Sequence, residues 1–322
     1  MQRNQLLLFK SCSLTGILWL LLLLKIEYLM YRYISVLRAQ DIYIHINVYM
    51  DGVVRKVNVR VLGKGVELLS ANGGRFEINQ LLFTDDTTLV ADSEEKLCRL
   101  VSEFGRVCER KKLRVNVGKS KVMRCSRYGN GDQMLVILNG EPLKEVNCFK
   151  YVGSQLAADG GCERGVVHRM NAGSRAWGTQ KSVMGNRALV IKAKKCLYEG
   201  VIVPTVLYRA ETLGMRSAER RKVNVLETKY LRSLVEVLRM DIVKNEEVRR
   251  RAGIERELAS GADQRVLRWF GHVERMDDYR MARSVLMAEV SGGRVRGRPR
   301  IGWMDGVRVA LGNRGMTVEA AR

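Results

Sequence analysis

The pattern of apolar and polar positions divides the chain into a strand-rich first half and a helical second half. Residues 76–90 alternate short apolar runs with polar positions, which predicts strand, tight turn and strand. Residues 97–108 place an apolar side chain at every third or fourth position, the spacing of one helical face. Helical spacing dominates from about Glu163 to Gly271. The chain is therefore predicted to be α+β.

Shorter elements are predicted between these long ones. Asp92, with Glu95 three positions later, forms a capping-box pattern at the start of the first helix. Asn139-Gly140 is a strong turn dipeptide and predicts a hairpin. Further strands are predicted by β-rich or alternating residues at positions 42–50, 113–117, 122–125 and 148–153.

The N-terminal region carries an apolar block at residues 17–24, between Lys10 and Lys25. The uncharged run is shorter than the roughly 20 residues that span a bilayer. No small-residue cleavage site follows the block, which weakens a signal-peptide interpretation. A membrane anchor through residues 11–30 and a buried helix both stay open.

The formal net charge of +22 is unevenly distributed. Residues 1–100 hold 12 Lys+Arg against 10 Asp+Glu, which leaves 44 against 24 for the rest of the chain. An excess of this size favours a polyanionic partner, nucleic acid first and an anionic membrane second.

Cysteine and histidine usage excludes several classes of site. The seven cysteines include no CxxC pair, so we expect reduced thiols and an intracellular protein of the nucleus or cytoplasm. The three histidines lie at no metal-ligand spacing from a cysteine, so no zinc site is expected. No small-molecule cofactor is indicated.

Two adjacent carboxylates, Asp85 and Asp86, lie at the turn between two apolar runs. Like charges in this position repel one another unless a cation lies between them. An isolated pair would be interpreted as an exposed acidic tip.

Residues around this pair resemble the FADD or YADD motif of reverse transcriptases from non-LTR (LINE-type) retrotransposons, particularly the RTE-like group. The motif is QLLFTDDTTLVADSEE at residues 80–95. Later segments resemble this family's motifs in the same order, at 113–122, 149–153 (FKYVG), 204–211 (PTVLYRAE), 267–276 (LRWFGHVERM) and 297–300 (GRPR). The resemblance covers about residues 48–322.

The resemblance implies a fold and a function. It implies a partial polymerase palm of antiparallel hairpins plus a helix, then a mostly helical thumb and C-terminal region. The corresponding division is an unrelated apolar segment at 1–40, palm at 41–156, thumb-like region at 157–240 and basic C-terminal region at 241–322. The implied activity is RNA-directed DNA polymerisation, with Mg²⁺ as cofactor and an RNA template, a DNA primer or their heteroduplex as partner.

The resemblance also implies roles for individual residues. Asp85 and Asp86 would bind Mg²⁺, and Lys119 or Lys121 would protonate the departing pyrophosphate, with the choice between the two left open. Residues implied to contact nucleic acid come from the primer-grip motif and from the basic tail, and they are Lys150, Tyr151, Gly153, Arg294, Arg296, Arg298 and Arg300. Basic faces of the thumb add Lys192, Lys194, Lys195, Arg220, Arg221, Lys222 and Lys229.

Departures from the family pattern imply that catalysis is incomplete. Two-metal catalysis needs a third aspartate on an earlier strand, and neither Asp41 nor Asp51 has the matching context. Arg209 and Leu213 replace the Gly and Trp of the thumb motif Y-G-x-E-x-W. We therefore expect a reverse transcriptase domain fragment that is inactive alone. The alternatives are a non-catalytic basic nucleic-acid-binding protein and a membrane-anchored protein.

Overall fold

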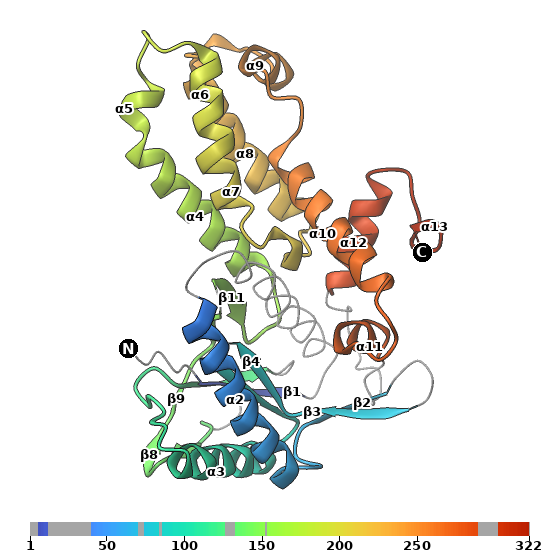
Figure 1. Ribbon diagram of the computed structural model, residues 1–322. Coiled ribbons are helices and arrows are strands. Elements are labelled where there is room, and N and C mark those ends of the chain that lie inside the picture. The colour runs from blue at the N-terminus through green and yellow to red at the C-terminus, as the bar shows by residue number, and fades with distance from the viewer. Residues whose placement is uncertain are drawn as a thin grey trace. The chain divides into compact units, whose positions relative to one another are not determined.

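The computed structural model describes residues 6–11, 40–69, 74–83, 86–125, 133–151, 153–288 and 302–321. The chain forms two compact units. The first comprises residues 1–152, 156–161 and 276–300, and the second comprises residues 153–155, 162–275 and 301–322. Strands belong almost entirely to the first unit and the second is mostly helical, which confirms the α+β class (Figure 1).

The main sheet of the first unit has five strands in the order β4-β5-β1-β6-β9. Strands β4 and β5 are antiparallel, while β5, β1, β6 and β9 run parallel to their neighbours. Their bounds are Gln80–Phe83 (β4), Asp86–Ala91 (β5), Leu6–Ser11 (β1), Lys121–Cys125 (β6) and Lys144–Glu145 (β9). Three two-stranded sheets pair β2 (Val66–Leu69) with β3 (Arg75–Ile78), β7 (Ile137–Leu138) with β8 (Glu141–Pro142), and β10 (Cys148–Tyr151) with β11 (Ser154–Ala157).

Two helices, α2 (Gln40–Arg60) and α3 (Glu94–Arg110), cover one face of this sheet. The predicted apolar face of α3 is buried in full, as in Leu97 and Phe104. It packs with Leu89 of β5, with Val122 of β6 and with α2 in a single core. Helix α11 (Met281–Met287) also belongs to this unit.

The strand predicted at 42–50 is wrong, because these residues lie in helix α2. Their β-branched and aromatic side chains suggested a strand. The apolar stripe nevertheless continues at helical spacing beyond them, through Val53, Val57 and Val61, all fully buried. Burial of such a stripe outweighs local strand propensity.

Other local predictions have mixed outcomes. The Asn139-Gly140 turn between β7 and β8 is confirmed, with both residues at positive φ. The N-cap of α3 is Ser93, whose hydroxyl accepts from Lys96 N at 3.2 Å, and not Asp92 as predicted. The strand predicted at 113–117 is irregular backbone, although its alternation is real because Val115 is buried.

Helical structure begins at Glu163, as predicted, and the second unit forms a helical core. The stripe of Val223, Tyr230 and Leu234 on α8 is buried there. Its elements are α4 (Glu163–Thr179), α5 (Lys181–Met184), α6 (Ile191–Leu197), the π-helix η1 (Tyr198–Ile202), α7 (Val203–Val206), η2 (Ala210–Thr212), α8 (Ser217–Leu234), η3 (Arg239–Asp241), α9 (Asn245–Ala252), α10 (Leu258–Glu274), α12 (Trp303–Gly312) and α13 (Val318–Ala321).

A buried carboxylate joins three elements of the helical core. Glu227 of α8 is 1% exposed. Its side chain accepts hydrogen bonds from Arg249 Nη2 at 2.5 Å, from Tyr198 Oη at 3.2 Å and from Leu258 N at 3.0 Å. The ion pair and both hydrogen bonds offset the cost of removing this charge from water.

The segment proposed as a membrane anchor comprises residues 11–30. All of it after Ser11 lies outside the described residues. Elsewhere, in the part of the chain that the structure describes, no helix combines the length and the apolar character required to traverse a bilayer.

The cysteines of the described residues are free thiols, as expected. Burial raises the pKa of Cys108 and of Cys125 to about 12, whereas Cys196 is exposed. We predict that iodoacetamide at about pH 8 alkylates Cys196 in the native chain, and alkylates Cys108 and Cys125 only after unfolding. Mass spectrometry of the labelled peptides measures this order, and rapid native labelling of Cys108 would contradict the core described above.

Candidate metal and nucleic-acid site

The aspartate pair belongs to the β4–β5 hairpin. Asp86 is the first residue of β5, is half-buried, and pairs with Phe83 in the antiparallel register. Thr84 and Asp85 lie outside the described residues. The two predicted strands are therefore confirmed as an antiparallel pair, and the metal-binding role of Asp85 and Asp86 stays a prediction.

Strand β1 lies beside β5 in the main sheet. Strand β1 runs parallel to β5, with Leu6 opposite Thr87 and Lys10 opposite Ala91. Its sequence, LLLFKS, contains no carboxylate. No group of three or more His, Cys, Asp or Glu side chains able to hold a metal ion occurs among the described residues.

The two upstream aspartates do not complete a metal site with Asp86. Asp41 and Asp51 both belong to helix α2. The Asp51 carboxylate forms an ion pair with Arg55 Nε at 2.7 Å. Two Mg²⁺ ions require oxygen ligands from more than one carboxylate turn. The donor set that the structure describes thus does not fit a two-metal site.

One candidate proton donor, Lys121, lies two strands from Asp86 in the main sheet. Lys121 begins β6 and is aligned, through Leu7 of β1, with Thr88 of β5. Because side chains alternate along a strand, Lys121 and Asp86 share one face of the sheet, but they are two strands apart, roughly 10 Å or more.

The two lysines differ in their local contacts. Lys121 Nζ donates to Gly118 O at 2.7 Å. Lys119 is exposed in the preceding turn, where its backbone N–H donates to Asn116 Oδ1 at 3.0 Å. The side chain of Lys119 is therefore the freer of the two, and neither role is decided.

Strand β10 alternates as the primer-grip motif predicted. Phe149 and Tyr151 are buried, and Lys150 between them is exposed. Tyr151 is only 2% exposed, so its ring packs inside the protein and is not available to a nucleic acid. Of the three motif residues, Lys150 and Gly153 remain candidates for phosphate contact.

Gly153 lies next to Tyr208 of the thumb motif, within the second unit. Its φ of +85° and its carbonyl, which accepts from Arg169 Nη2, fix the turn after β10. A Cβ at this position would lie 3.0 Å from Tyr208 Cε1. The Arg169 guanidinium stacks over the Tyr208 ring at 4.6 Å. No local sequence signal marked Arg169, because its partners lie 16 and 39 residues away in the chain.

Arg209, which stands where the motif that the sequence resembles has glycine, has a left-handed backbone with φ of 58°. This explains why glycine suits the position, since a left-handed non-glycine residue costs about 1–2 kcal/mol. The Arg209 side chain is buried, and its Nε and Nη1 find no hydrogen-bond partner among the described residues.

Replacing Arg209 by glycine is predicted to stabilise the chain by about 1–2 kcal/mol, because it removes backbone strain and an unpaired buried donor. Urea unfolding of the full chain measures the change. Asn139→Gly is the matched control at another positive φ, and it should change stability less because asparagine tolerates this conformation. A destabilised Arg209→Gly chain would show that the guanidinium has a structural role.

Several basic residues assigned to the thumb are neutralised within the second unit. Lys194 is buried and pairs with Glu236 at 3.0 Å. Lys222 pairs with Glu163 at 2.6 Å, and Arg220 pairs with Asp263. These cations are less available to a nucleic acid than the sequence suggested. The arginine strip Arg294, Arg296, Arg298 and Arg300 lies outside the described residues.

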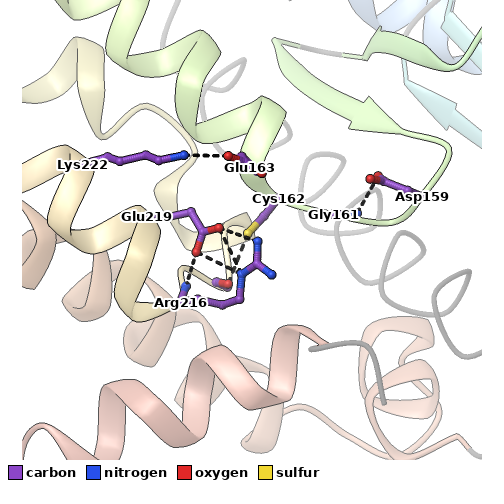
Figure 2. A network of polar contacts seen from close by, with 8 residues as sticks. Asp159, Gly161, Cys162, Glu163, Arg216, Glu219 and Lys222 are labelled. Carbon is purple, nitrogen blue, oxygen red and sulfur yellow. Dashed lines mark hydrogen bonds and ion pairs between the residues drawn. The ribbon is translucent and has the colours of Figure 1, made fainter. Parts of the chain in front are cut away.

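A polar network joins the starts of α4 and α8 (Figure 2). Arg216 N donates to Glu219 Oε2 at 2.9 Å, and Cys162 Sγ donates to Gly214 O at 3.3 Å. Burial, and then the charge of Glu219, raise the pKa of Cys162 to about 11. Cys162 is therefore protonated at neutral pH, and the network caps α8 instead of activating a nucleophile.

Aromatic residues of the C-terminal signature are packed inside the second unit. Trp269 and Phe270 of α10 and Trp303 of α12 are all buried. Trp303 Nε1 donates to Glu211 O at 2.9 Å, and its ring lies 6.5 Å from that of Phe270. These rings hold helices together and are not available for stacking on bases.

The chain is similar to an uncharacterised transposon-derived protein of Caenorhabditis elegans. The two are 25% identical over 252 residues, which cover 74% of this chain and 86% of the nematode protein. No protein-family model and no solved structure matches the chain. The similarity indicates a transposon-related origin.

Proposed function

We propose that this chain derives from the reverse transcriptase of a non-LTR retrotransposon of the RTE-like group, and that it binds nucleic acid without polymerising DNA. The observation that carries the proposal is the antiparallel pair β4–β5, whose second strand begins at Asp86 of the Asp85-Asp86 motif, followed by α3 and β6. Residues Phe149 to Tyr151 of the FKYVG motif lie on β10 and follow in the family's order. The similarity to a transposon-derived protein supports the same origin.

The aspartates would supply oxygen ligands for Mg²⁺, which in a complete polymerase stabilises the attacking and leaving oxygens of nucleotide transfer. The neighbouring strand β1 has the sequence LLLFKS, which contains no carboxylate that could serve as the third aspartate. Hard cations bind poorly to such a set. We therefore derive no catalytic step through a metal in this chain.

Nucleic-acid binding needs no metal, and the net charge of +22 favours it. Lys150 is exposed and Gly153 presents backbone at a tight turn, so both can approach phosphates. The four arginines of the basic tail would add charge-assisted contacts. Such contacts read the phosphate backbone and carry little base specificity.

Fluorescence anisotropy with a labelled RNA–DNA primer–template tests the binding. We expect the full chain to bind in EDTA, with an affinity that falls steeply as salt increases because counterions are released. Absence of binding at low salt would overturn the proposal. An affinity independent of salt would also contradict it, since phosphate contacts would then be absent.

A further inference from the structure

A groove of about 610 Å³ lies between helices α2 and α3 of the first unit. Five cations line it, together with Val59 and Val107. They come from the C-terminal halves of both helices and are Arg55, Lys56, Arg60, Arg110 and Lys111. The two helices lie side by side (Figure 1), so residues 50 positions apart in the chain contribute to one surface.

Two of these cations are paired with carboxylates, one within helix α2 and one between α2 and α3. Arg55 pairs with Asp51 at 2.7 Å, and Arg60 lies 3.9 Å from Glu103, which also pairs with Arg106 at 2.7 Å. These ion pairs leave the groove's positive charge to the other three side chains.

The remaining three, Lys56, Arg110 and Lys111, have no carboxylate within ion-pair distance in the part of the chain that the structure describes. Arg110 Nε donates to Arg106 O, and the Lys111 ammonium lies 5.2 Å from the Tyr49 ring centroid. The groove therefore carries about three uncompensated positive charges. Its lining also offers one accessible apolar side chain, because Val59 is exposed whereas Val107 is buried.

We propose that this groove binds the phosphate backbone of single-stranded nucleic acid, with phosphates at the basic side chains and sugars beside Val59. The inference rests on the proposed nucleic-acid-binding function and assigns it a surface distinct from the β4–β5 hairpin and from β10. A polyanion is the occupant that matches unpaired cations from two helices. A second copy of this chain carries the same formal net charge of +22 and would be repelled by the groove.

The sequence did not mark this surface. Residues 1–100 are nearly balanced in charge, and the cations are separated along the chain. Arg60 and Arg110 also lie in the last turns of their helices, where cations stabilise the helix dipole. That local role predicts a loss of stability on substitution, whereas the proposed role predicts a loss of binding.

The test compares two triple variants of the full chain by anisotropy with a labelled oligouridylate. The groove variant is Lys56→Ala, Arg110→Ala and Lys111→Ala. The control variant removes the same charge from exposed sites elsewhere in the unit, Arg99→Ala, Arg114→Ala and Lys144→Ala. Thermal unfolding of both variants verifies that they are folded.

We expect the affinity of the groove variant to be lower by about tenfold or more. The slope of log affinity against log salt concentration should decrease in magnitude by about two, since each phosphate contact on a single strand contributes about 0.7 to that slope. The control variant should lose much less. Equal binding by the groove variant and the native chain would overturn the groove but leave the proposed function intact. Equal losses of affinity in the two variants would show that net charge alone is responsible for binding. That result would also overturn the assignment of binding to the groove.

A native chain that fails to bind oligouridylate would contradict both the proposed function and the groove. A polyglutamate peptide that binds the groove more tightly than an oligouridylate of equal charge would assign the surface to an acidic protein instead. Lysine acetylation gives an independent readout without substitution. Bound oligouridylate should protect Lys56 and Lys111 and leave Lys144 reactive, and unprotected Lys56 and Lys111 would overturn the assignment.

Discussion

Replacing Glu227 by alanine is expected to lower the free energy of unfolding by about 3–5 kcal/mol, because it leaves a nearly buried arginine without its counter-charge. Arg249 has a side chain that is 14% exposed, and its Nη2 lies 2.5 Å from the Glu227 carboxylate. The Tyr198 hydroxyl and the Leu258 N–H lose their acceptor as well. Urea unfolding of the full chain, followed by circular dichroism, measures the loss.

Glu163→Ala is the matched control for this prediction. Glu163 also pairs with a basic residue of the second unit, Lys222, but its side chain is 52% exposed. Exposed pairs contribute little, so its stability should be close to that of the native chain. If Glu227→Ala unfolds like this control, the buried network described for the helical core is wrong.

Replacing Trp303 by alanine is expected to cost about 3–5 kcal/mol, the range for truncating a large buried aromatic side chain. The ring is 4% exposed, packs near Phe270 and donates to Glu211 O. The prediction also separates packing from base stacking. A packing residue changes stability, whereas an exposed stacking residue changes nucleic-acid affinity without changing stability.

Trp303→Phe distinguishes the two contributions of this side chain. Phenylalanine keeps most of the apolar contact and loses the hydrogen bond to Glu211, so it should cost about 1–2 kcal/mol. The salt dependence of oligonucleotide binding should be the same for the native chain and for folded Trp303→Phe. A variant of native stability that binds RNA more weakly would instead place Trp303 at the nucleic acid.

The sequence predicted those elements whose signals are local. Helix α3 was predicted because its apolar positions follow one helical face, and the Asn139-Gly140 turn because those residues favour positive φ. The residues at 42–50 were misassigned because local strand propensity was weighed without the buried stripe that continues to Val61. Propensity decides only where tertiary packing does not.

Pairing between distant segments could not be predicted. The central place of β1 between β5 and β6 depends on contacts across more than 80 residues, and nothing in LLLFKS specifies those partners. Alternation at 113–117 correctly indicated a buried Val115, but a strand also needs a neighbour with which to pair.

The candidate site follows the same division. The hairpin around Asp86 and the alternating exposure of Phe149, Lys150 and Tyr151 were predictable from short motifs. The contact between Arg169 and Gly153 was not, because it depends on how α4 packs. The sequence showed that Arg209 departs from the glycine of the resembled motif. Only the structure showed that this residue has a positive φ, which is strained for a residue other than glycine.

Single-nucleotide primer extension tests most directly the central claim, that the proposed metal site of this chain is incomplete. The full chain is incubated with an RNA template, a DNA primer, nucleotides and Mg²⁺, beside an Asp85→Asn variant. We predict that the native chain gives no more product than the variant, since strand β1 carries no carboxylate beside β5. Mg²⁺-dependent extension by the native chain that Asp85→Asn abolishes would contradict the account.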